Sequence, residues 1–412
     1  MRSNMHCIDG FNSKVILLLV TLSSFLMACK SEINSILEMP VPTTRSAVFP
    51  FLTSDDSHLY LSWIETIHDT IDILKVARGS EEGFEYVTEV ARGNDWFINW
   101  ADFPKIAAFS SGKYITHWLK KSSSSTYDYN IHVGIGSFGA SQTDTSFILH
   151  DDGINAEHGF VSFQPYGKGM MTVWLDGRDT KRADNTYGQM TLRSAIITDK
   201  GKKEKDIEID SRICDCCQTD LTGMGDDVMV VYRDRSEAEI RDNYFSLYKK
   251  GQWSDGLLIN EDRWTIAGCP VNGPAIHSHQ GTTAAIWYSE GSGSPGVYLS
   301  VYDSIEMEFQ VPVVVKESAD ILGRVDVKVI GKDMIAYSWL EKQGDQGILK
   351  LEIISKEGKI LKNFDLDFVE SSRNSGFSHI AFLKGVIYVA YTSSGSYKGI
   401  KVKAIEINGL TY

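Results

Sequence analysis

A short sequence pattern recurs seven times along the chain and limits the architectures that it can adopt. Each occurrence is an apolar segment that ends in an aromatic residue and is followed by a polar turn. The aromatic positions lie 52 to 58 residues apart and are Trp63, Trp118, Trp174, Tyr232, Trp287, Trp339 and Tyr391. Such a constant period is typical of a repeat protein in which each repeat is one supersecondary unit.

Each repeat divides into four short apolar segments separated by Gly, Ser and Asp turns, without long helical periodicity. In the fifth repeat these segments are PAIHSHQ, TTAAIWYS, GVYLSVYD and QVPVVVK. A four-stranded unit that recurs about every 50 residues is a propeller blade. The sequence therefore predicts an all-β fold, a β-propeller of seven four-stranded blades, with six blades and a β-rich extension as the alternative. The seventh repeat lacks room for its outer strand, which Ser35 to Val41 is expected to supply.

The first 28 residues have the features of a bacterial lipoprotein signal peptide. The apolar run Val15 to Ala28 is too short to span a bilayer and ends in the letters LMAC, which resemble a lipobox. Cys29 is therefore predicted to carry lipid, with residues 29–44 as a tether and residues 45–412 as the propeller domain. The predicted location is the outer membrane of the cell envelope, facing the periplasm or the surface. The alternative is an ordinary cleaved signal with a chance cysteine.

The net charge of −13 narrows the range of partners. Basic residues do not cluster into a stripe, which argues against nucleic acid. No later apolar run is long enough to cross a membrane, so membrane contact is expected through the lipid anchor alone. The predicted partner is a glycan or another small-molecule ligand, and the protein is expected to be a monomer.

The residues that lead into the first strand of each blade are expected to gather at one mouth of the central channel. In this chain these stretches are DWFINWADFP, AEHGFVSF, RICDCCQTD, AGCPVNGP, LGRVDV and SSRNSGFSH. Polar, aromatic and small residues crowd them, where a purely structural strand would alternate Val and Ile. Because function resides in sites rather than in folds, we expect the functional site at this mouth.

The motifs NWADFP, EHGF, CDCCQT, YRDRS with EIRD, AGCPVNGP and GRVDV resemble those of bacterial secreted sialidase-like propellers, also called BNR-type proteins. The resemblance covers residues from about 45 to 400. It implies a propeller fold and an activity related to that of exo-sialidase glycosidases. The Asp-boxes of true sialidases (S-x-D-x-G-x-T-W) are not intact, and their arginine motif is absent, with RSAVFP at Arg45 only approximating it. Whether the chain is an enzyme stays open.

Several blade starts carry groups suited to acid–base chemistry. Paired carboxylates near one mouth serve glycoside hydrolysis, and a neighbouring histidine can act as an acid, a base or a ligand. The candidate catalytic residues are Asp102, Glu157, His158 and Asp326. The alternative for each carboxylate is a structural role, capping a strand or binding backbone amides, and for His158 it is a buried, hydrogen-bonded histidine.

Aromatic and cationic residues supply candidate contacts for a sugar. Guanidinium groups bind carboxylates and sulfates through two parallel hydrogen bonds, and aromatic faces suit sugar rings. The candidate substrate-binding residues are Trp96, Trp100, Asn272, Arg324 and Arg178. The alternative is that the aromatic rings seal the blades and that the arginines form salt bridges between them.

Four cysteines remain once the signal peptide and the lipobox cysteine are set aside: Cys214, Cys216, Cys217 and Cys269. In an exported protein thiols tend to pair, so one interpretation is a disulfide from the triplet to Cys269 that staples blades four and five. Another is a copper or zinc site in which the four thiols, together with His158, are the ligands. If the triplet lies in a strand, Cys214 and Cys216 face one neighbouring blade and Cys217 faces the other.

Three functions follow from these alternatives. The first is a carbohydrate-active protein, hydrolase or binder, that acts on acidic glycans outside the cell. The second is a metal-binding or thiol-redox propeller that uses the cysteines. The third is a non-catalytic scaffold that presents its loops to partner proteins.

Overall fold

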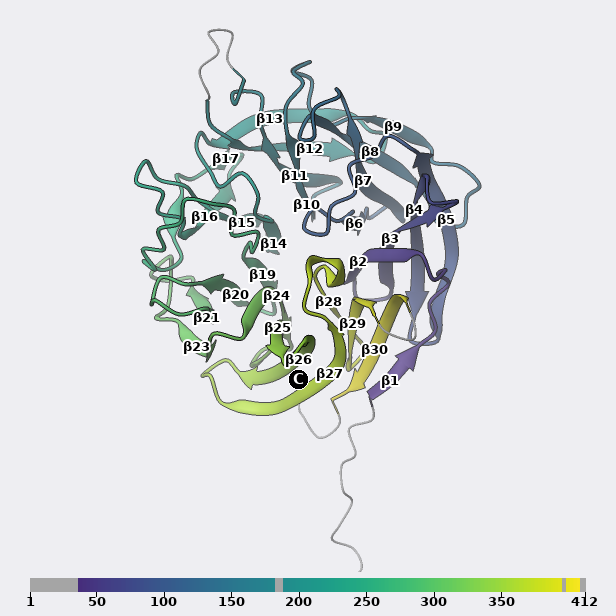
Figure 1. Cartoon of the computed structure of the whole chain (residues 1–412). Helices are drawn as coiled ribbons and strands as arrows, with labels where there is room; N and C mark the ends of the chain where they lie inside the picture. Colours follow the sequence, from purple (N-terminus) through teal and green to yellow (C-terminus); the bar gives the residue numbers. More distant parts are fainter. Residues whose placement is uncertain (1–35, 182–187, 395–397, 408–412) are drawn as a thin grey trace, which may run out of the picture.

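The computed structural model of the protein describes residues 36–181, 188–394 and 398–407, and its fold is a seven-bladed β-propeller (Figure 1). Seven antiparallel sheets follow one another around a central channel, and the inner strands of neighbouring blades contact each other around the whole ring. Among the described residues there is no α-helix, and the one helical turn is the 3-10 helix η1 (Arg373–Ser375). The prediction of an all-β propeller with seven blades is confirmed, and the six-bladed alternative is wrong.

Within each blade the strands run in order from the channel to the rim. The strands of blades one to three are β2 (Ala47–Ser54), β3 (Leu59–Ile67), β4 (Ile71–Ser80), β5 (Gly83–Gly93), β6 (Ile106–Ala108), β7 (Lys113–Lys121), β8 (Tyr129–Ser137), β9 (Thr145–Ile148), β10 (His158–Tyr166), β11 (Gly169–Asp176), β12 (Thr191–Thr198) and β13 (Lys203–Asp210). In blades four and five two short strands share the outer position, and the strands are β14 (Asp220–Met224), β15 (Asp227–Arg233), β16 (Asn243–Lys249), β17 (Gln252–Trp253), β18 (Leu257–Leu258), β19 (Ala275–His279), β20 (Thr282–Ser289), β21 (Gly296–Asp303), β22 (Glu308–Phe309) and β23 (Val313–Glu317). The strands of blades six and seven are β24 (Ile321–Ile330), β25 (Met334–Gln343), β26 (Gln346–Ser355), β27 (Ile360–Glu370), β28 (His379–Leu383), β29 (Val386–Ser393), β30 (Gly399–Glu406) and β1 (Ile36–Met39).

The ring is closed by a strand from the other end of the chain. In Figure 1 the purple strand β1 lies beside the yellow strand β30, with which it pairs as the outer strand of blade seven. The register places Ile36 opposite Ile405 and Met39 opposite Val402. The strand expected between Ser35 and Val41 is therefore present, and one sheet holds both ends of the described chain.

The seven aromatic residues of the sequence repeat all lie in the second strand of a blade and are buried against the preceding blade. Two of them hydrogen-bond within their own strand: Trp63 Nε1 donates to Glu65 at 2.8 Å, and Trp174 Nε1 donates to Asp176 at 2.7 Å. In both pairs the acceptor lies two residues further on, on the same face of the strand. A buried aromatic ring with a satisfied polar tip contributes much of the packing between blades, which explains why the pattern recurs.

Carboxylates on three inner strands, or just before them, hold neighbouring blades together. In each pair an aspartate Oδ2 accepts a hydrogen bond from a backbone N–H of the next blade's inner strand. The pairs are Asp102 with Phe160 at 2.9 Å, Asp220 with Ile276 at 2.9 Å and Asp326 with Ile380 at 2.6 Å. Buried amides of the channel wall thereby gain a partner that their own sheet does not supply.

The predicted signal peptide (residues 1–28) and the predicted lipidation site Cys29 lie outside the described residues, so both stay predictions. Within the described residues, no helix is long and apolar enough to span a bilayer.

Candidate functional site

Three β-bulges shape the front mouth of the channel, which is the end at which the inner strands begin. The register of the inner strands β2, β10 and β24 shifts near their starts. At these shifts Phe49, Phe160 and Arg324 have φ angles of 53°, 54° and 56°. Positive φ is unfavourable for residues with a side chain, and bulges commonly re-aim side chains next to functional sites. The three bulged side chains contact the other residues of the front mouth.

An aromatic cluster forms the floor of the front mouth. Trp100 and Phe377 stack with ring centroids 5.8 Å apart, and Phe103 lies 5.6 Å from Phe377. Phe103 and Phe377 belong to the same buried cluster as Phe160, while Trp100 is half-buried at its edge. Phe103 and Phe377 also line a small cavity further along the channel, so the aromatic floor separates the mouth from the channel interior.

Two arginines lie over the Trp100 ring. The guanidinium carbons of Arg324 and Arg373 are 4.9 and 5.7 Å from its centroid, within the range of a cation–π contact. Arg324 is buried, donates to the carbonyl oxygen of Ser372 at 3.0 Å and also hydrogen-bonds Ser375. Burial, followed by the charge of Arg373, lowers the pKa of Arg324 to about 10. Arg324 therefore has limited capacity for a ligand, whereas Arg373 is exposed.

Asn272 lies next to Arg324. Its Oδ1 accepts a hydrogen bond from the backbone N–H of Arg324 at 2.7 Å, and its Nδ2 donates to the carbonyl oxygen of Leu322 at 3.3 Å. Both polar ends of this side chain are thus engaged in holding the bulge of β24. Asn272 positions Arg324 and offers little to a ligand.

Glu157, just before β10, is the most perturbed carboxyl group of the front mouth. Tyr129 donates to its Oε1 at 2.8 Å, the one hydrogen bond that a described residue makes to this carboxyl group. Burial raises the pKa of Glu157 to about 8, and the charges of Asp215, Asp102 and Cys269 act in the same direction. The carboxyl group is therefore mostly protonated at neutral pH, the state required of a general acid.

Asp102 lies close to Glu157, but both of its oxygens face protein groups. Oδ2 accepts from the Phe160 N–H, and Oδ1 is 3.9 Å from His117 Nε2. A Cβ atom on Gly159 would lie 2.1 Å from Asp102 Oδ2, so this approach requires glycine at position 159. The geometry matches the structural alternative for Asp102, a carboxylate that binds a backbone amide.

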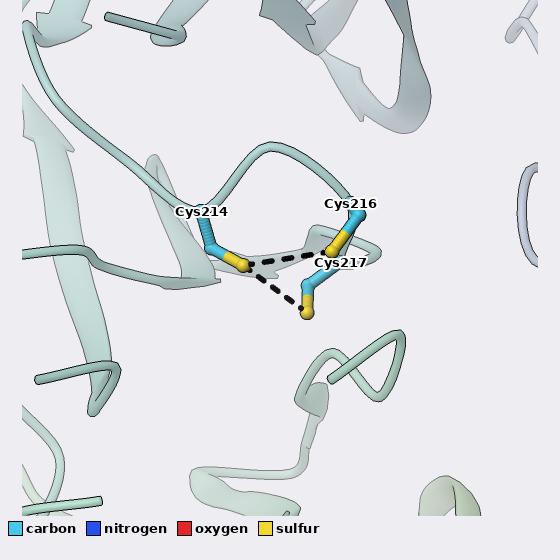
Figure 2. A group of neighbouring side chains, drawn as sticks. All are labelled: Cys214, Cys216 and Cys217. Carbon is cyan, nitrogen blue, oxygen red and sulfur yellow. Dashed lines mark hydrogen bonds between the residues drawn. The ribbon is translucent and has the colours of Figure 1, made fainter. Parts of the chain in front are cut away.

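The cysteine triplet is not part of a strand. The directions in which its side chains face had been predicted for a strand. Residues 214–217 form a turn before β14, and this turn brings all three sulfur atoms to one side (Figure 2). Cys214 Sγ lies 3.9 Å from Cys216 Sγ and 3.6 Å from Cys217 Sγ. The expectation that Cys217 faces away from the other two is therefore wrong, because the period-two alternation of a strand does not apply to a turn.

All four cysteines are free thiols, and none lies at disulfide distance from another, so the structure does not contain the predicted staple to Cys269. Arg241 Nη1 contacts Cys214 Sγ at 3.1 Å. Hydrogen bonds with Cys216 and Cys217, together with the charge of Arg241, hold the pKa of the Cys214 thiol well below its usual range. A hydrogen bond from Cys216 lowers the pKa of Cys269 to about 7. The pKa values of the Cys216 and Cys217 thiols are raised, so only Cys214 and Cys269 of the four have a lowered thiol pKa.

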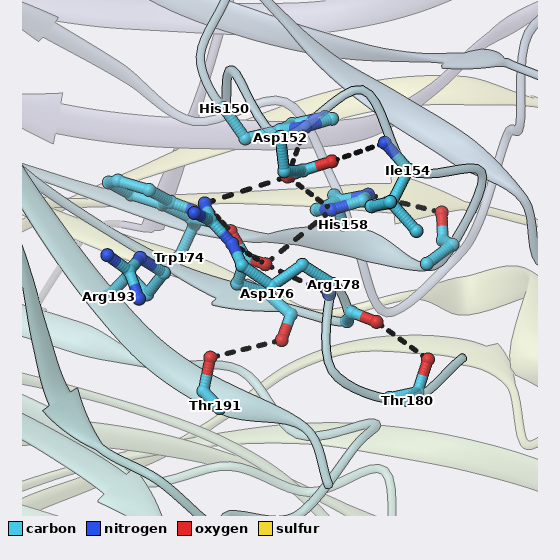
Figure 3. Close-up of polar contacts among 12 residues, drawn as sticks. His150, Asp152, Ile154, His158, Trp174, Asp176, Arg178, Thr180, Thr191 and Arg193 are labelled. Carbon is cyan, nitrogen blue, oxygen red and sulfur yellow. Dashed lines mark hydrogen bonds and ion pairs between the residues drawn. The ribbon is translucent and has the colours of Figure 1, made fainter. Parts of the chain in front are cut away.

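His158 does not reach the front mouth. It follows Glu157 directly, so its side chain leaves the chain on the opposite side and is fully buried between blades two and three. Its Nε2 lies 3.1 Å from Asp152 Oδ2 and 3.6 Å from Asp176 Oδ1, and its Nδ1 faces the carbonyl oxygens of Tyr129 and Ala156 (Figure 3). The prediction that His158 lines the mouth beside Glu157 is wrong. His158 is the buried, hydrogen-bonded histidine of the alternative interpretation.

Arg178 belongs to the same buried network and is also remote from the mouth. Its Nε and Nη2 donate to the two oxygens of Asp176 at 2.8 and 2.7 Å, in the bidentate geometry typical of such pairs (Figure 3). The ring of His150 stacks on that of His158 at 3.6 Å, and burial lowers the pKa of His150 to about 4. The network matches the salt-bridge alternative for Arg178.

The last two predicted residues are Trp96 and Asp326. Trp96 is buried against Trp118, with ring centroids 6.0 Å apart, and lines a small cavity with Phe49 and Asp102, so it packs between blades beside the front mouth. Asp326 faces a polar cavity of about 240 Å³ that opens toward the other end of the channel, where Lys328 and His277 also line it. Burial raises the pKa of Asp326 to about 7. The expectation that Asp326 lines the same mouth as Asp102 and Glu157 is wrong.

Sequence reasoning did not assign three contributors to the front mouth. Tyr129 stands in the third strand of blade two, where it looks like an ordinary core residue. Arg241 and Arg373 lie in the stretches EIRD and SSRNSGFSH, but no spacing links them to the cysteines or to Trp100. Only the three-dimensional arrangement of neighbouring blades brings these groups to Glu157, Cys214 and Trp100.

The fold and the site together define a seven-bladed propeller whose front mouth combines a protonated carboxyl group, a cysteine cluster and an arginine-flanked tryptophan. No family model and no curated protein matches the chain. Among solved structures it is similar to polysaccharide lyase Uly1, with a TM-score of 0.51, 8% identity and coverage of 92% of this chain and 94% of that one. A protein of unknown function from Dyadobacter fermentans has a TM-score of 0.50 and 11% identity, covering 74% and 94%.

A third similar structure, the endosialidase of phage phi92, has a TM-score of 0.47 and 6% identity, covering 92% of this chain and 70% of that one. At such low identities these similarities show the propeller fold alone. They agree with the sialidase-like resemblance only at the level of fold. They do not test the CDCCQT motif.

Proposed function

We propose that the protein binds and cleaves an acidic glycan at the front mouth of its propeller. The observation that carries the proposal is Glu157, a carboxyl group with its pKa raised to about 8, to which only Tyr129 donates a hydrogen bond among the described residues. Such a group holds a proton at neutral pH, which the leaving oxygen of a glycosidic bond requires. The fold adds support, since polysaccharide lyase Uly1 has a similar one.

In this proposal Glu157 donates a proton to the leaving-group oxygen, while Asp215, as the second carboxylate, takes a proton from the water that attacks the anomeric carbon, so that the glycosidic bond is hydrolysed. Asp215 replaces the predicted Asp102 in this role because its side chain is 39% exposed, with Arg235 Nη1 3.1 Å from its Oδ1, whereas the side chain of Asp102 is 1% exposed and holds the next blade. Tyr129 fixes the orientation of Glu157 through its 2.8 Å hydrogen bond. Asp102 is then a positioning residue that acts through Gly159 and Phe160.

Trp100 and Arg373 supply the recognition of an acidic sugar. The indole face offers an apolar platform for a sugar ring, and the exposed guanidinium can bind a carboxylate or a sulfate. Arg373 has no ion-pair partner among the described residues, which leaves it available for a ligand. Arg373 is an exposed cation on a chain whose net charge is −13.

A screen of uronate-containing, sialylated and sulfated oligosaccharides tests the proposal, with binding measured on an array and cleavage measured by product mass. We expect binding to at least one acidic class and no binding to the matched neutral oligosaccharides. Neutral glycans bound equally well, or no glycan bound at all, would contradict the proposal and favour the scaffold alternative.

We also propose that Cys29 carries lipid and anchors a monomer to the bacterial outer membrane. The lipobox-like letters LMAC after a short apolar run support this proposal. Incorporation of a labelled fatty acid into the wild-type chain but not into Cys29→Ser, together with the mass in detergent solution, would test it. Equal labelling of both chains would refute the anchoring site.

A further inference from the structure

The cysteine turn has the spacing of a three-coordinate metal site. Cys214 Sγ lies 3.9 and 3.6 Å from the other two sulfurs, and all three atoms lie within 4.8 Å of one another (Figure 2). Metal–sulfur bonds of about 2.3 Å in a planar trigonal arrangement place sulfur atoms about 4 Å apart. The free thiols therefore need to move by only a fraction of an ångström to surround an ion.

The ligand set has three members rather than four. The carboxylate of Asp215, the residue between the first two cysteines, is already engaged by Arg235 Nη1 at 3.1 Å. Cys269 interacts with Cys216 but stands on the approach to blade five, outside the three-sulfur group. Structural zinc sites in proteins are almost always four-coordinate, whereas soft thiolate ligands select Cu(I). The geometry thus favours copper over zinc.

The surroundings suit an anionic thiolate centre that an ion can reach. Arg241 Nη1 contacts Cys214 Sγ at 3.1 Å, and Glu239 holds that guanidinium through Nη2 at 2.9 Å. The backbone N–H of Cys214 donates to the carbonyl oxygen of Arg233 at 3.0 Å, which fixes the turn to blade four. Cys214 and Cys217 are buried and Cys216 is half-exposed, so one side of the cluster is open to solvent. A metal site in a protein requires neighbouring groups that orient its ligands and a path by which the ion can enter.

The other group of ligand types, His150, Asp152 and His158, lacks this character. Both ring nitrogens of His158 face oxygen acceptors, and Arg178 Nη2 lies 3.6 Å from Asp152 Oδ2 (Figure 3). The Asp152 carboxylate is therefore already engaged by the guanidinium group and by both histidines. That network is accounted for as an ion-pair cluster between blades.

We propose that Cys214, Cys216 and Cys217 bind one Cu(I) ion in a trigonal thiolate site at the front mouth. The proposal stands apart from glycan binding, because it rests on the sulfur geometry and on Arg241 alone. It gives the CDCCQT motif a role that packing does not explain: a packing role requires neither three thiols on one side of a turn nor a guanidinium beside them.

Anaerobic titration of the reduced full chain with Cu(I), in competition with bicinchoninate, tests the proposal. We expect one tightly bound Cu(I) per chain and a sulfur-to-copper absorption band in the ultraviolet. X-ray absorption of the wild-type complex should show three sulfur neighbours and needs no variant. Cys214→Ser and Cys216→Ser should each weaken binding by more than about a hundredfold, beyond the range typical of outer-shell changes.

Cys269→Ser is the matched control, and it should leave the copper stoichiometry and affinity unchanged. Arg241→Gln should keep the stoichiometry and weaken binding by about tenfold, as an outer-shell change does. Four sulfur neighbours, tight zinc binding that Cys269→Ser abolishes, or copper retained by the Cys214→Ser/Cys216→Ser/Cys217→Ser chain would each overturn the proposal. A disulfide between two of the three thiols that resists reduction and prevents copper binding would also overturn it.

Discussion

The proposed cleavage depends on Glu157, because its carboxyl group supplies the proton. Its pKa lies at about 8 in the folded chain and near the ordinary 4.5 in the unfolded chain, because burial disfavours the charged form. Between these two values the folded state binds more protons than the unfolded state. The contribution of Glu157 to stability is therefore greatest at or below pH 4.5 and is lost as the pH rises toward 8.

Glu157→Gln is expected to separate this effect from the rest of the chain. The amide mimics the protonated group, so the midpoint of thermal unfolding should fall less between pH 5 and pH 8.5 than in the wild type. Cleavage of a glycan by the wild type should fall about tenfold per pH unit above 8, while the variant loses cleavage by about a hundredfold or more and still binds. Glu82→Gln, at an exposed carboxyl, is the control and should match the wild type in both assays. Parallel pH profiles for wild type and Glu157→Gln would contradict the assignment.

The residue scale is also where sequence reasoning reached its limit. Glu157 and His158 are adjacent, and nothing in their letters tells which one faces the channel. One residue of offset sends His158 between blades two and three and leaves Glu157 at the mouth. The prediction for the cysteine triplet was wrong for a related reason, because a turn gathers side chains that a strand would separate.

The closing strand β1 carries a testable share of the stability at the scale of elements. Met39 is 6% exposed and packs in the cluster shared by blades seven and one, whereas Leu37 in the same strand is 54% exposed. Met39→Ala should lower the free energy of unfolding by about 2–5 kcal/mol, because it removes buried side-chain volume. Leu37→Ala is the matched control and should change it by less than about 0.5 kcal/mol.

Urea unfolding followed by tryptophan fluorescence measures both changes. Equal effects of the two substitutions would mean that β1 does not close the ring in solution. A chain that starts after residue 41 lacks β1 altogether and should, by contrast, be destabilised at least as much as Met39→Ala.

Strand order could be predicted because the aromatic pattern reports packing directly. Trp63 and Trp174 each place a buried ring and an acidic acceptor at a spacing of two, and the aromatic position recurs in the second strand of every blade. The bulges could not be predicted. Phe49 and Phe160 adopt positive φ angles of 53° and 54°, which are locally unfavourable for a phenylalanine. The packing of the closed ring of blades must therefore impose them.

For the molecule as a whole, blade starts hold two kinds of polar residue that look alike in sequence. Asp102 and Asp326 accept backbone N–H groups from the next blade, which makes them part of the frame. Glu157 and the cysteine turn make no such bond to a following blade among the described contacts. The ring geometry separates frame from site, and a list of blade starts taken from sequence mixes the two.

The location of the site at the front mouth is the central claim, and binding by two matched variants tests it most directly. Arg373 and Lys384 are both exposed cations, but Arg373 lies over Trp100 at the front mouth, whereas Lys384 lines a cavity at the opposite end of the channel. Calorimetric titration with an acidic oligosaccharide should give Arg373→Ala about tenfold weaker binding than the wild type, as expected for loss of a charge-assisted contact worth about 1.5 kcal/mol or more. Lys384→Ala should bind like the wild type. Weaker binding by Lys384→Ala with unchanged binding by Arg373→Ala would place the site at the other mouth and contradict the account.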